Sequence, residues 1–398
     1  MPEVLKLGKF DEGAGPTSWT AWFRQWHADA MPADGRFRGE ADGEWISPAA
    51  RPGGAVRELQ SRLQRIGFLP HAEPDGIFDY RTKSAARLFQ EYVRSVEGHG
   101  DIGAPDGAVG PKTLGDLERW ERDGLRPYWA AATSAAPTAE FRTWLKALEL
   151  FKAANGAEPI AKSVELAEAY AGSCDTCKVD DWQFAADDIH LLGIRREEWK
   201  KTQERQNDDL FVLLSNGVAF KFFGSTDPSA RMAERADEPF IVRGQHRYRF
   251  GWHKQSDRNR VYRALRPAGP GVLVCRDFER DDALTDADLA GGLEPNDTIN
   301  VHWSGTGTSN WSAGCQVIAG SRYIDGEGRK VDCAAFAART YTELNAKTRG
   351  AYNVLIDLLT VSAPKPWTRS GSIIHYFLVY EKDLDLDIAP LTARLLIA

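Results

Sequence analysis

One short phrase occurs twice in the first third of the chain, and it restricts the fold there more than any other feature. PDGIFDYRTKSAARLFQ (residues 74–90) and PDGAVGPKTLGDL (residues 105–117) each place an Asp-Gly pair ahead of a threonine at nearly the same spacing. Asp-Gly favours a tight turn, and threonine is a preferred residue at the start of a helix. The repetition predicts one turn-and-helix unit built twice.

Apolar residues at helical spacing surround this repeat. Val56, Leu59, Leu63 and Ile66 are three and four positions apart, which predicts the buried side of a helix that ends at Gly67. Each Asp-Gly turn then precedes a further helix. Residues 53–128 are therefore expected to form a small bundle of three helices.

This region resembles the peptidoglycan-binding domain built of three helices. The repeat of that family reads as a DG turn, a small gap, a threonine cap and a helix that ends in Phe-Gln. Residues 53–122 match it over its whole length, although Asp79 stands where the family usually has glycine. The resemblance implies binding of peptidoglycan, both its stem peptides and its glycan. The alternative is a helical bundle without a ligand, because leucine and alanine stripes are common.

The chain on either side of this bundle is organised differently. Residues 1–52 indicate a loosely organised lead-in, with one aromatic helix candidate around Trp22 and Trp26. Residues 129–139, AAATSAAPTAE, are small and contain proline, which is typical of a linker. Residues 140–186 predict a helical connecting region, with helices over FRTWLKALELFKAA and AKSVELAEAYAG.

Residues 187–398 change to short β-like runs, which predicts a strand-dominated, mixed domain. Two apolar runs flank Ser215-Asn216-Gly217 and predict a hairpin. Further strands are expected at 246–253, 261–265, 271–278, 297–303, 315–319 and 373–381, and one helix at 333–347. The whole chain is thus expected to be a multidomain α+β protein.

The five cysteines are too few for a disulfide scaffold in a chain of 398 residues. Cys174 and Cys177 form a CxxC pair that leaves three interpretations open: a structural zinc site, a local disulfide or redox pair, or two unlinked thiols. Zinc needs about four ligands, and neither a second CxxC nor a histidine pair lies nearby. No metal and no cofactor is therefore predicted.

The segment INVHWSGTGTSNWSAGCQVIAG (residues 299–320) combines a cysteine, a histidine and a glycine-rich loop. A cysteine attacks as its thiolate, and a nearby imidazole lowers the thiol pKa below its free value of about 8.5. His302 precedes Cys315 by one loop, and Gly314 lets main-chain N–H groups beside the sulfur approach an oxyanion. A buried cysteine and a hydrogen-bonded histidine are the structural alternatives. Their combination in one loop favours nucleophilic catalysis.

The same segment resembles the L,D-transpeptidase family, whose signature is His-x-x-Gly followed by a loop and Ser-His-Gly-Cys-x-Arg. HWSG (residues 302–305) fits the first part and SAGC (residues 312–315) fits the second, and the similarity extends from about residue 187 to residue 382. Ala313 replaces the second histidine, and Val317 stands where the family has arginine. Papain-like wall hydrolases also pair cysteine with histidine, but they place the cysteine first.

The resemblance implies a strand-dominated catalytic domain and a role for each residue of the loop. Cys315 would attack the carbonyl of a stem-peptide bond with His302 as base, while the carbonyl of Trp303 holds the imidazole. Ser312 and Gly314 would lie beside the nucleophile. An amine acceptor then gives a crosslink, and water gives carboxypeptidase or endopeptidase activity. The residues expected to bind substrate are Trp311 and Gly305, together with His253, Tyr248 and Arg276 as substitutes for the missing arginine.

Composition limits the partners. A formal net charge of -7 offers no large cationic surface for nucleic acid. No apolar run approaches the roughly 20 residues of a membrane span, and the start of the sequence lacks the apolar core of a secretory signal. An enzyme of the bacterial wall would therefore need an export or injection apparatus, or release by lysis. The alternative function is a non-catalytic, wall-binding structural or cargo protein of a phage-like or contractile injection particle.

Overall fold

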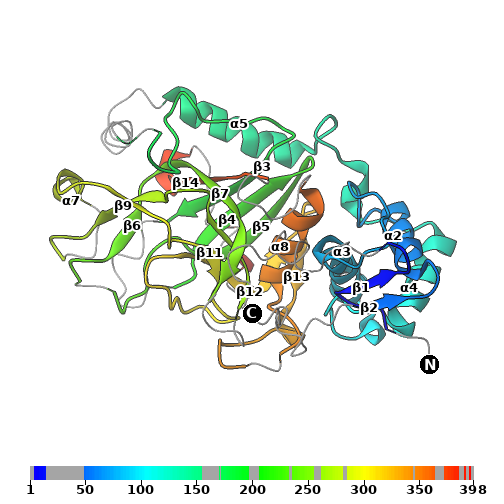
Figure 1. Ribbon diagram of the computed structural model, residues 1–398. Helices are drawn as coiled ribbons and strands as arrows, with labels where there is room; N and C mark the ends of the chain where they lie inside the picture. Colours follow the sequence, from blue (N-terminus) through cyan, green and yellow to red (C-terminus); the bar gives the residue numbers. More distant parts are fainter. Residues whose placement is uncertain are drawn as a thin grey trace.

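The computed structural model of this protein describes residues 4–14, 49–154, 170, 172–196, 206–232, 235–254, 261–280, 285–343, 346–363, 372–384, 390 and 394–395. Trp22, Trp26 and most of the helix expected over residues 161–172 lie outside these ranges. Figure 1 shows a small helical unit at one end of the protein and a large strand-rich unit beside it. None of the helices within the described ranges is long and apolar enough to cross a bilayer.

Three helices and a pair of parallel strands form the small unit, which we name the N-terminal module (residues 4–14 and 49–125). The prediction of a helical bundle is confirmed. The described part of the expected lead-in belongs to this module, because Leu5 and Leu7 are buried in its core. The elements are β1 (Lys9–Asp11), β2 (Ala49–Arg51), α2 (Ala55–Arg65), α3 (Tyr80–Glu91), α4 (Pro111–Asp123), a π-helical turn η1 (Tyr92–Val96) and a 3₁₀ turn η2 (Gly100–Ile102).

Helix α2 is capped by a residue far from it in sequence. Gly54 occupies its N-cap and has no side chain to offer. The Asp11 carboxylate accepts hydrogen bonds from the main-chain N–H groups of Val56 and Arg57 instead, both at 2.9 Å. A cap of this kind is worth about 1 kcal/mol, so it joins the N-terminal strand to the bundle.

Each Asp-Gly turn is held by a glutamine side chain from the preceding helix. In the first turn Gln60 accepts a hydrogen bond from Gly76 N (2.8 Å) and donates one to the Thr82 hydroxyl (3.0 Å). In the second turn Gln90 makes the same two bonds, at 2.8 and 3.0 Å, to Gly107 and to the equivalent threonine. The sequence repeat is thus a structural repeat, and the glutamines are part of it.

Within the described ranges, nine strands form one sheet, and eight of them close into a mixed barrel. The order is β11–β8–β7–β14–β3–β4–β5–β12, with β13 beyond β12, and a parallel pairing of β11 with β12 closes the barrel. The prediction of a strand-dominated, mixed unit is confirmed. The strands are β3 (Ile189–Arg195), β4 (Asp209–Ser215), β5 (Val218–Ser225), β7 (Gly244–His253), β8 (Tyr262–Pro267), β11 (Val301–Trp303), β12 (Gln316–Ile324), β13 (Lys330–Asp332) and β14 (Ile374–Tyr380).

The hairpin expected around Ser215-Asn216-Gly217 is confirmed. It joins β4 to β5, and Asn216 and Gly217 both have positive φ, at 48° and 77°. Two successive residues with positive φ give the turn whose twist matches that of the flanking strands.

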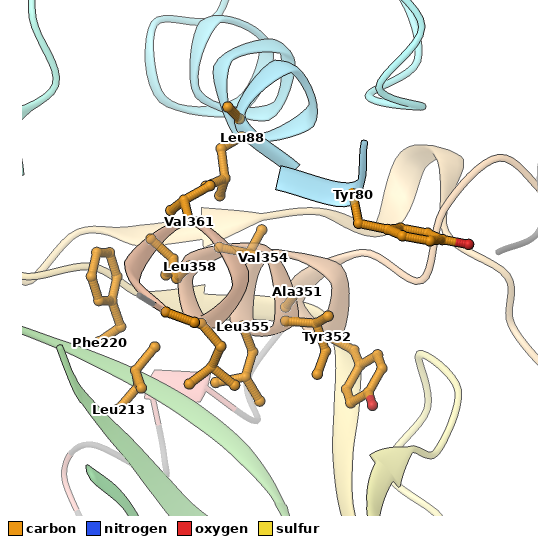
Figure 2. Packing of buried hydrophobic residues seen from close by; sticks show 14 of the residues in the cluster. Tyr80, Leu88, Leu213, Phe220, Ala351, Tyr352, Val354, Leu355, Leu358 and Val361 are labelled. Carbon is orange, nitrogen blue, oxygen red and sulfur yellow. The ribbon is translucent and has the colours of Figure 1, made fainter. Parts of the chain in front are cut away.

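Side chains alternate between the two faces of the sheet, and each face packs against a different helix. Leu213 and Phe220 share one buried cluster with α8 (Ala351–Ser362), and Figure 2 shows α8 between these strands and α3. Val212 and Ala219 belong to a second cluster with α5 (Ala139–Ala154). Because α8 is covered on every side, its sequence lacks an amphipathic stripe, and its polar residues, such as Asp357, are buried as well.

A smaller sheet and several short turns complete the strand-rich unit. Strands β10, β9 and β6 pair in that order, all antiparallel. The remaining elements are β6 (Pro239–Ile241), β9 (Val272–Arg276), β10 (Glu294–Asn296), α7 (Asp286–Ala290) and the 3₁₀ turns η3 (Tyr128–Ala131), η5 (Ala334–Phe336) and η6 (Glu381–Asp383).

The helix expected over residues 333–347 is wrong. Among the described residues of this range, 333–343 and 346–347, the structure has the short 3₁₀ turn η5 and no α-helix, and the α-helix of this region is α8. Main-chain hydrogen bonds hold the segment against its neighbours: Cys333 N donates to Ser321 O (2.8 Å), and Ala338 N donates to Thr348 O (2.9 Å). A continuous helix would lose these bonds, so tertiary pairing overrides the local helix propensity.

The expected linker, residues 129–139, packs between the two units. The ring of Trp129 lies 5.4 Å from that of Phe68 in the N-terminal module and 5.8 Å from that of Phe220 on β5. Aromatic contacts of this kind add to the burial of both rings. The segment therefore contacts the module and the barrel together.

Candidate functional site

Cys315 lies directly before β12, where β11 and β12 close the barrel. The pairing of Val301 with Gln316 places Cys315 opposite Asn300. The main-chain N–H of Asn300 donates to Cys315 Sγ (3.3 Å), and the thiol donates to Thr298 O (3.4 Å). Opposite residues and alternate residues of paired strands share a face, so His302 lies on the same face as Cys315 and Asn300.

His302 is held by three oxygen atoms around its Nδ1. That nitrogen lies 2.8 Å from Trp303 O, 3.0 Å from the Tyr341 hydroxyl and 3.2 Å from the Tyr262 hydroxyl. A carbonyl oxygen can only accept, so Nδ1 carries the ring proton and Nε2 keeps its lone pair. Burial lowers the pKa of His302 to about 4. The ring is therefore neutral at pH 7, which is the form a general base requires.

A second imidazole, that of His253, stacks on the first. The ring centroids of His253 and His302 are 4.0 Å apart, with 19° between the planes. The side-chain amide of Asn300 donates to His253 Nδ1 at 3.2 Å. Burial and then the neighbouring His302 lower the pKa of His253 far below its usual value. The site therefore holds two neutral imidazoles. Asn300 bonds both the sulfur and His253, and His253 stacks on His302.

The thiol of Cys315 is half-buried, and burial raises its pKa. The Asn300 N–H, the Ser312 hydroxyl and the positive charges of Lys254 and Arg266 act in the opposite direction. Cys315 and His302 are both described, and no hydrogen bond joins them in this conformation. The thiol is therefore protonated at neutral pH.

Two glycines determine the course of the loop between β11 and Cys315. Gly305 has φ +93°, and a Cβ there would lie 2.4 Å from Arg339 O. Gly314 has φ +150°, and a Cβ there would lie 2.3 Å from Pro239 Cγ. Both positions exclude a side chain. The Gly314 N–H donates to Ser312 Oγ (3.2 Å), so this amide is engaged within the loop.

Two residues expected to bind substrate lie in different surroundings. Trp311 is 57% exposed, and the guanidinium of Arg231 lies 5.6 Å from its ring centroid. Tyr248 is completely buried, and its hydroxyl donates to Ile299 O (3.1 Å). Trp311 is thus open to a ligand, whereas Tyr248 supports the main chain that leads into β11.

The positive charges at the site come from residues other than the predicted Arg276. The guanidinium of Arg276 forms an ion pair with Glu294. Lys254 directly follows His253, is exposed, and has its ammonium 5.8 Å from the ring centroid of Tyr341. Lys254 and Arg266 are the two cations that favour the Cys315 thiolate.

Several residues of the site were not predicted from the sequence. Asn300 lies two residues before His302, and Lys254 directly follows His253, so strand alternation and adjacency could have identified them. Tyr262 and Tyr341 lie about 40 residues from His302 on either side. No sequence pattern connects such distant residues, and only the closed barrel brings them together.

Cys174 and Cys177 line a separate cavity of about 290 Å³, together with Arg247 and His375. Both are free thiols, and burial raises the pKa of Cys177 to about 11. Of the three interpretations that the sequence left open, the structure contains two unlinked thiols. In the part of the chain that is described, no three His, Cys, Asp or Glu side chains are arranged to hold a metal ion.

Comparison with known proteins finds one family whose model matches part of this chain. No curated protein matches the chain significantly. A crystal structure of a fused Zn-dependent amidase/peptidase/peptidoglycan-binding domain-containing protein from Clostridium acetobutylicum ATCC 824 is 14% identical, covering 82% of this chain and 96% of that chain. Its TM-score of 0.23 is too low for the likeness to bear on fold or function. The family described as "putative peptidoglycan binding domain" matches residues 52–94, which include α2, the first Asp-Gly turn and α3.

Proposed function

We propose that this protein binds peptidoglycan through its N-terminal module and breaks or exchanges amide bonds of the stem peptides through Cys315. The observation that carries the proposal is the series of contacts that leads from the sulfur to Asn300, to His253 and to His302. A cysteine grouped with neutral imidazoles suits covalent acyl transfer. The family match at residues 52–94 supports the bacterial wall as the place of action.

The first chemical step is proton transfer followed by attack. The thiol proton of Cys315 moves to Nε2 of His302, and the thiolate attacks the carbonyl of a stem-peptide bond between a diamino acid and D-alanine. The C–N bond breaks, the leaving amine takes the proton from the imidazolium, and a thioester remains on Cys315. Trp303 O and the two tyrosine hydroxyls keep the ring oriented during these transfers.

The second step returns the free thiol. Water attacks the thioester and gives hydrolysis, or the side-chain amine of a second stem attacks it and gives a crosslink. Lys254 and Arg266 stabilise negative charge on the sulfur and on the tetrahedral intermediate. They thereby provide the positive charge that Val317 lacks in the position of the family's arginine.

Mass spectrometry of muropeptides incubated with the full-length protein tests this proposal. Wild type should convert stem tetrapeptides to shorter or crosslinked products, and both Cys315→Ser and His302→Gln should lower the rate by about 10³-fold or more. Cys177→Ser is the matched control, because Cys177 is the other half-buried thiol, and it should retain the wild-type rate.

The opposite result would favour the second function that the sequence allows. In that case the wild type would form no product, and both Cys315→Ser and His302→Gln would still bind sacculi. The protein would then be a non-catalytic wall-binding component.

A further inference from the structure

The ends of β7 and β8 form a hairpin pair whose two sides contact different parts of the protein. Trp252 pairs with Arg263, and His253 pairs with Tyr262. Directly opposite residues point to the same side of a sheet, and successive residues point to opposite sides. The Trp252–Arg263 pair and the His253–Tyr262 pair therefore face in opposite directions.

The His253–Tyr262 side forms a wall of the candidate site. His253 stacks on His302 at 4.0 Å, and the Tyr262 hydroxyl lies 3.2 Å from His302 Nδ1. His302 thus depends on the position of this hairpin for two of its contacts. Other titratable or charged groups lie near the two histidines. They are Lys254 directly after β7, Arg266 of β8, Tyr341 and Arg349 before α8, and Cys315 directly before β12.

The Trp252–Arg263 side packs against helix α3 of the N-terminal module. The ring of Trp252 lies 5.6 Å from that of Tyr80, in an edge-to-face arrangement. Arg263 donates to Ser84 Oγ at 2.8 Å, and its guanidinium lies 5.5 Å from the Tyr80 ring centroid. Tyr80 of α3 thus contacts both members of the pair, and Ser84 contacts Arg263.

A buried ion cluster joins α3 and β8 to helix α8. Asp357 of α8 binds Arg263 at 2.7 Å and Arg87 of α3 through two bonds of 2.6 and 2.8 Å. All three side chains are almost completely buried. Separating the partners would leave a charge buried without compensation, so the cluster resists relative movement of the module and the hairpin.

The contacts use one stripe of α3. Tyr80, Ser84 and Arg87 are spaced by four and three residues, so they lie on the same side of the helix, and all three are buried. Leu88 points toward Val361 of α8 beside them in Figure 2. A binding domain that moved freely on a linker would expose this stripe to solvent, whereas here it is covered.

We propose that the N-terminal module is a positioning part of the candidate catalytic site. Through Tyr80, Ser84 and Arg87 it holds the Trp252–Arg263 side of the hairpin, and it thereby sets His253 and Tyr262 against His302. This inference rests on the proposed function for the role of His302 as the base. The geometry of the site then depends on α3, which ends more than 150 residues before His253 in the chain.

The ring pKa of His302 in full-length variants tests the proposal, measured by NMR on protein with ¹³C-labelled histidine and assigned with His302→Gln. Tyr80→Ala should loosen the hairpin and admit water, so the pKa should rise from about 4 toward its ordinary value by at least about one unit. Ser84→Ala removes only a hydroxyl and should shift it by less in the same direction. Leu63→Ala is the matched control, because Leu63 is buried in α2 and lies outside the stripe.

The possible outcomes separate this inference from the proposed function. An unchanged pKa in Tyr80→Ala, or an equal rise in Leu63→Ala, would overturn the positioning role. If wild type forms no peptidoglycan product while Tyr80→Ala alone shifts His302, the positioning role stands and the chemistry fails. If Tyr80→Ala forms product at the wild-type rate with an unchanged pKa, the chemistry stands and the positioning role fails.

Discussion

The two Asp-Gly turns of the N-terminal module and the loop over residues 302–315 are both built around glycines, but different forces hold them. In each turn, a glutamine 16 or 17 residues before the glycine accepts its N–H. In the loop, Gly305 packs on the carbonyl of Arg339 and Gly314 packs on the ring of Pro239. The turns are therefore specified by nearby sequence, whereas the loop is specified by distant segments of the fold.

The two turns also differ from each other at the start of the helix that follows. Asp79 caps α3 by accepting from Thr82 N at 2.9 Å. Gly110 occupies the same place before α4, offers no side-chain cap, and is followed by Pro111. Burial raises the pKa of Asp79 to about 6. One repeat thus carries a titrating group in a place where the other has none.

The largest effect is expected from filling the space that the loop glycines leave. Gly305→Ala and Gly314→Ala combine a positive φ with a clash, and each should lower the free energy of unfolding by about 3 kcal/mol. Gly307→Ala in the same loop has its nearest neighbour at 4.0 Å and should cost less than about 1 kcal/mol. Urea midpoints measure the difference. Equal midpoints for Gly314→Ala and Gly307→Ala would show that the fold does not constrain this loop.

The hydrogen bonds that hold the two Asp-Gly turns can be removed by replacing their glutamines. Gln60→Leu and Gln90→Leu each remove the acceptor of a buried glycine N–H and one hydrogen bond of a threonine hydroxyl, so each should lower the free energy of unfolding by about 2 kcal/mol. Within the described part of the chain, the Gln64 side chain makes one hydrogen bond, of 3.4 Å to Ala72 O. Gln64→Leu should therefore change the free energy of unfolding by less than about 0.5 kcal/mol. Chemical denaturation compares the three. If Gln64→Leu lost as much stability as Gln60→Leu, the hydrogen bonds to the turn glycine would not be what stabilises the turn.

In the loop, the non-local support of His302 can be removed one hydroxyl at a time. Tyr341→Phe deletes one of the three contacts of Nδ1 and leaves Trp303 O and the Tyr262 hydroxyl. The loss of about 1 kcal/mol of orientation should lower kcat/KM on muropeptides about fivefold. Tyr262→Phe should have a similar effect. Full activity in the double variant would mean that the Trp303 carbonyl alone orients the ring.

The smallest effect concerns the cap that only one repeat has. The pKa of Asp79 is higher in the folded chain than its ordinary 3.8, so the folded state binds this proton more tightly. Its contribution to stability is complete below about pH 4 and is lost as the pH rises through 6. Asp79→Asn keeps a capping oxygen without titrating, so it should gain up to about 1 kcal/mol on wild type between pH 4 and 7. Thermal melting against pH checks this, and parallel curves for the two proteins would rule it out.

The sequence allowed the helical module to be predicted because its signals are local. Turn residues, caps and apolar spacing lie within a few residues of each other, and the family match at residues 52–94 agrees with them. The helix predicted over residues 333–347 was wrong for the opposite reason. Its segment has good helix formers, but bonds to Ser321 and Thr348 hold it in another conformation, and α8 was missed because it is covered on every side.

The doubled turn and the strand-rich second half could be predicted from the sequence alone, and so could the position of His302 and Cys315 at the two ends of one loop. The surroundings of these two residues could be seen only in the folded protein. Asn300 bonds Cys315 and His253, two distant tyrosine hydroxyls lie beside the His302 ring, and α3 packs on the other side of the β7–β8 hairpin. The difference follows from how far apart in the chain the interacting residues lie. Turns, caps and periodicity depend on neighbours in the chain, whereas burial, and the pKa values that follow from it, depend on segments that meet only when the barrel closes.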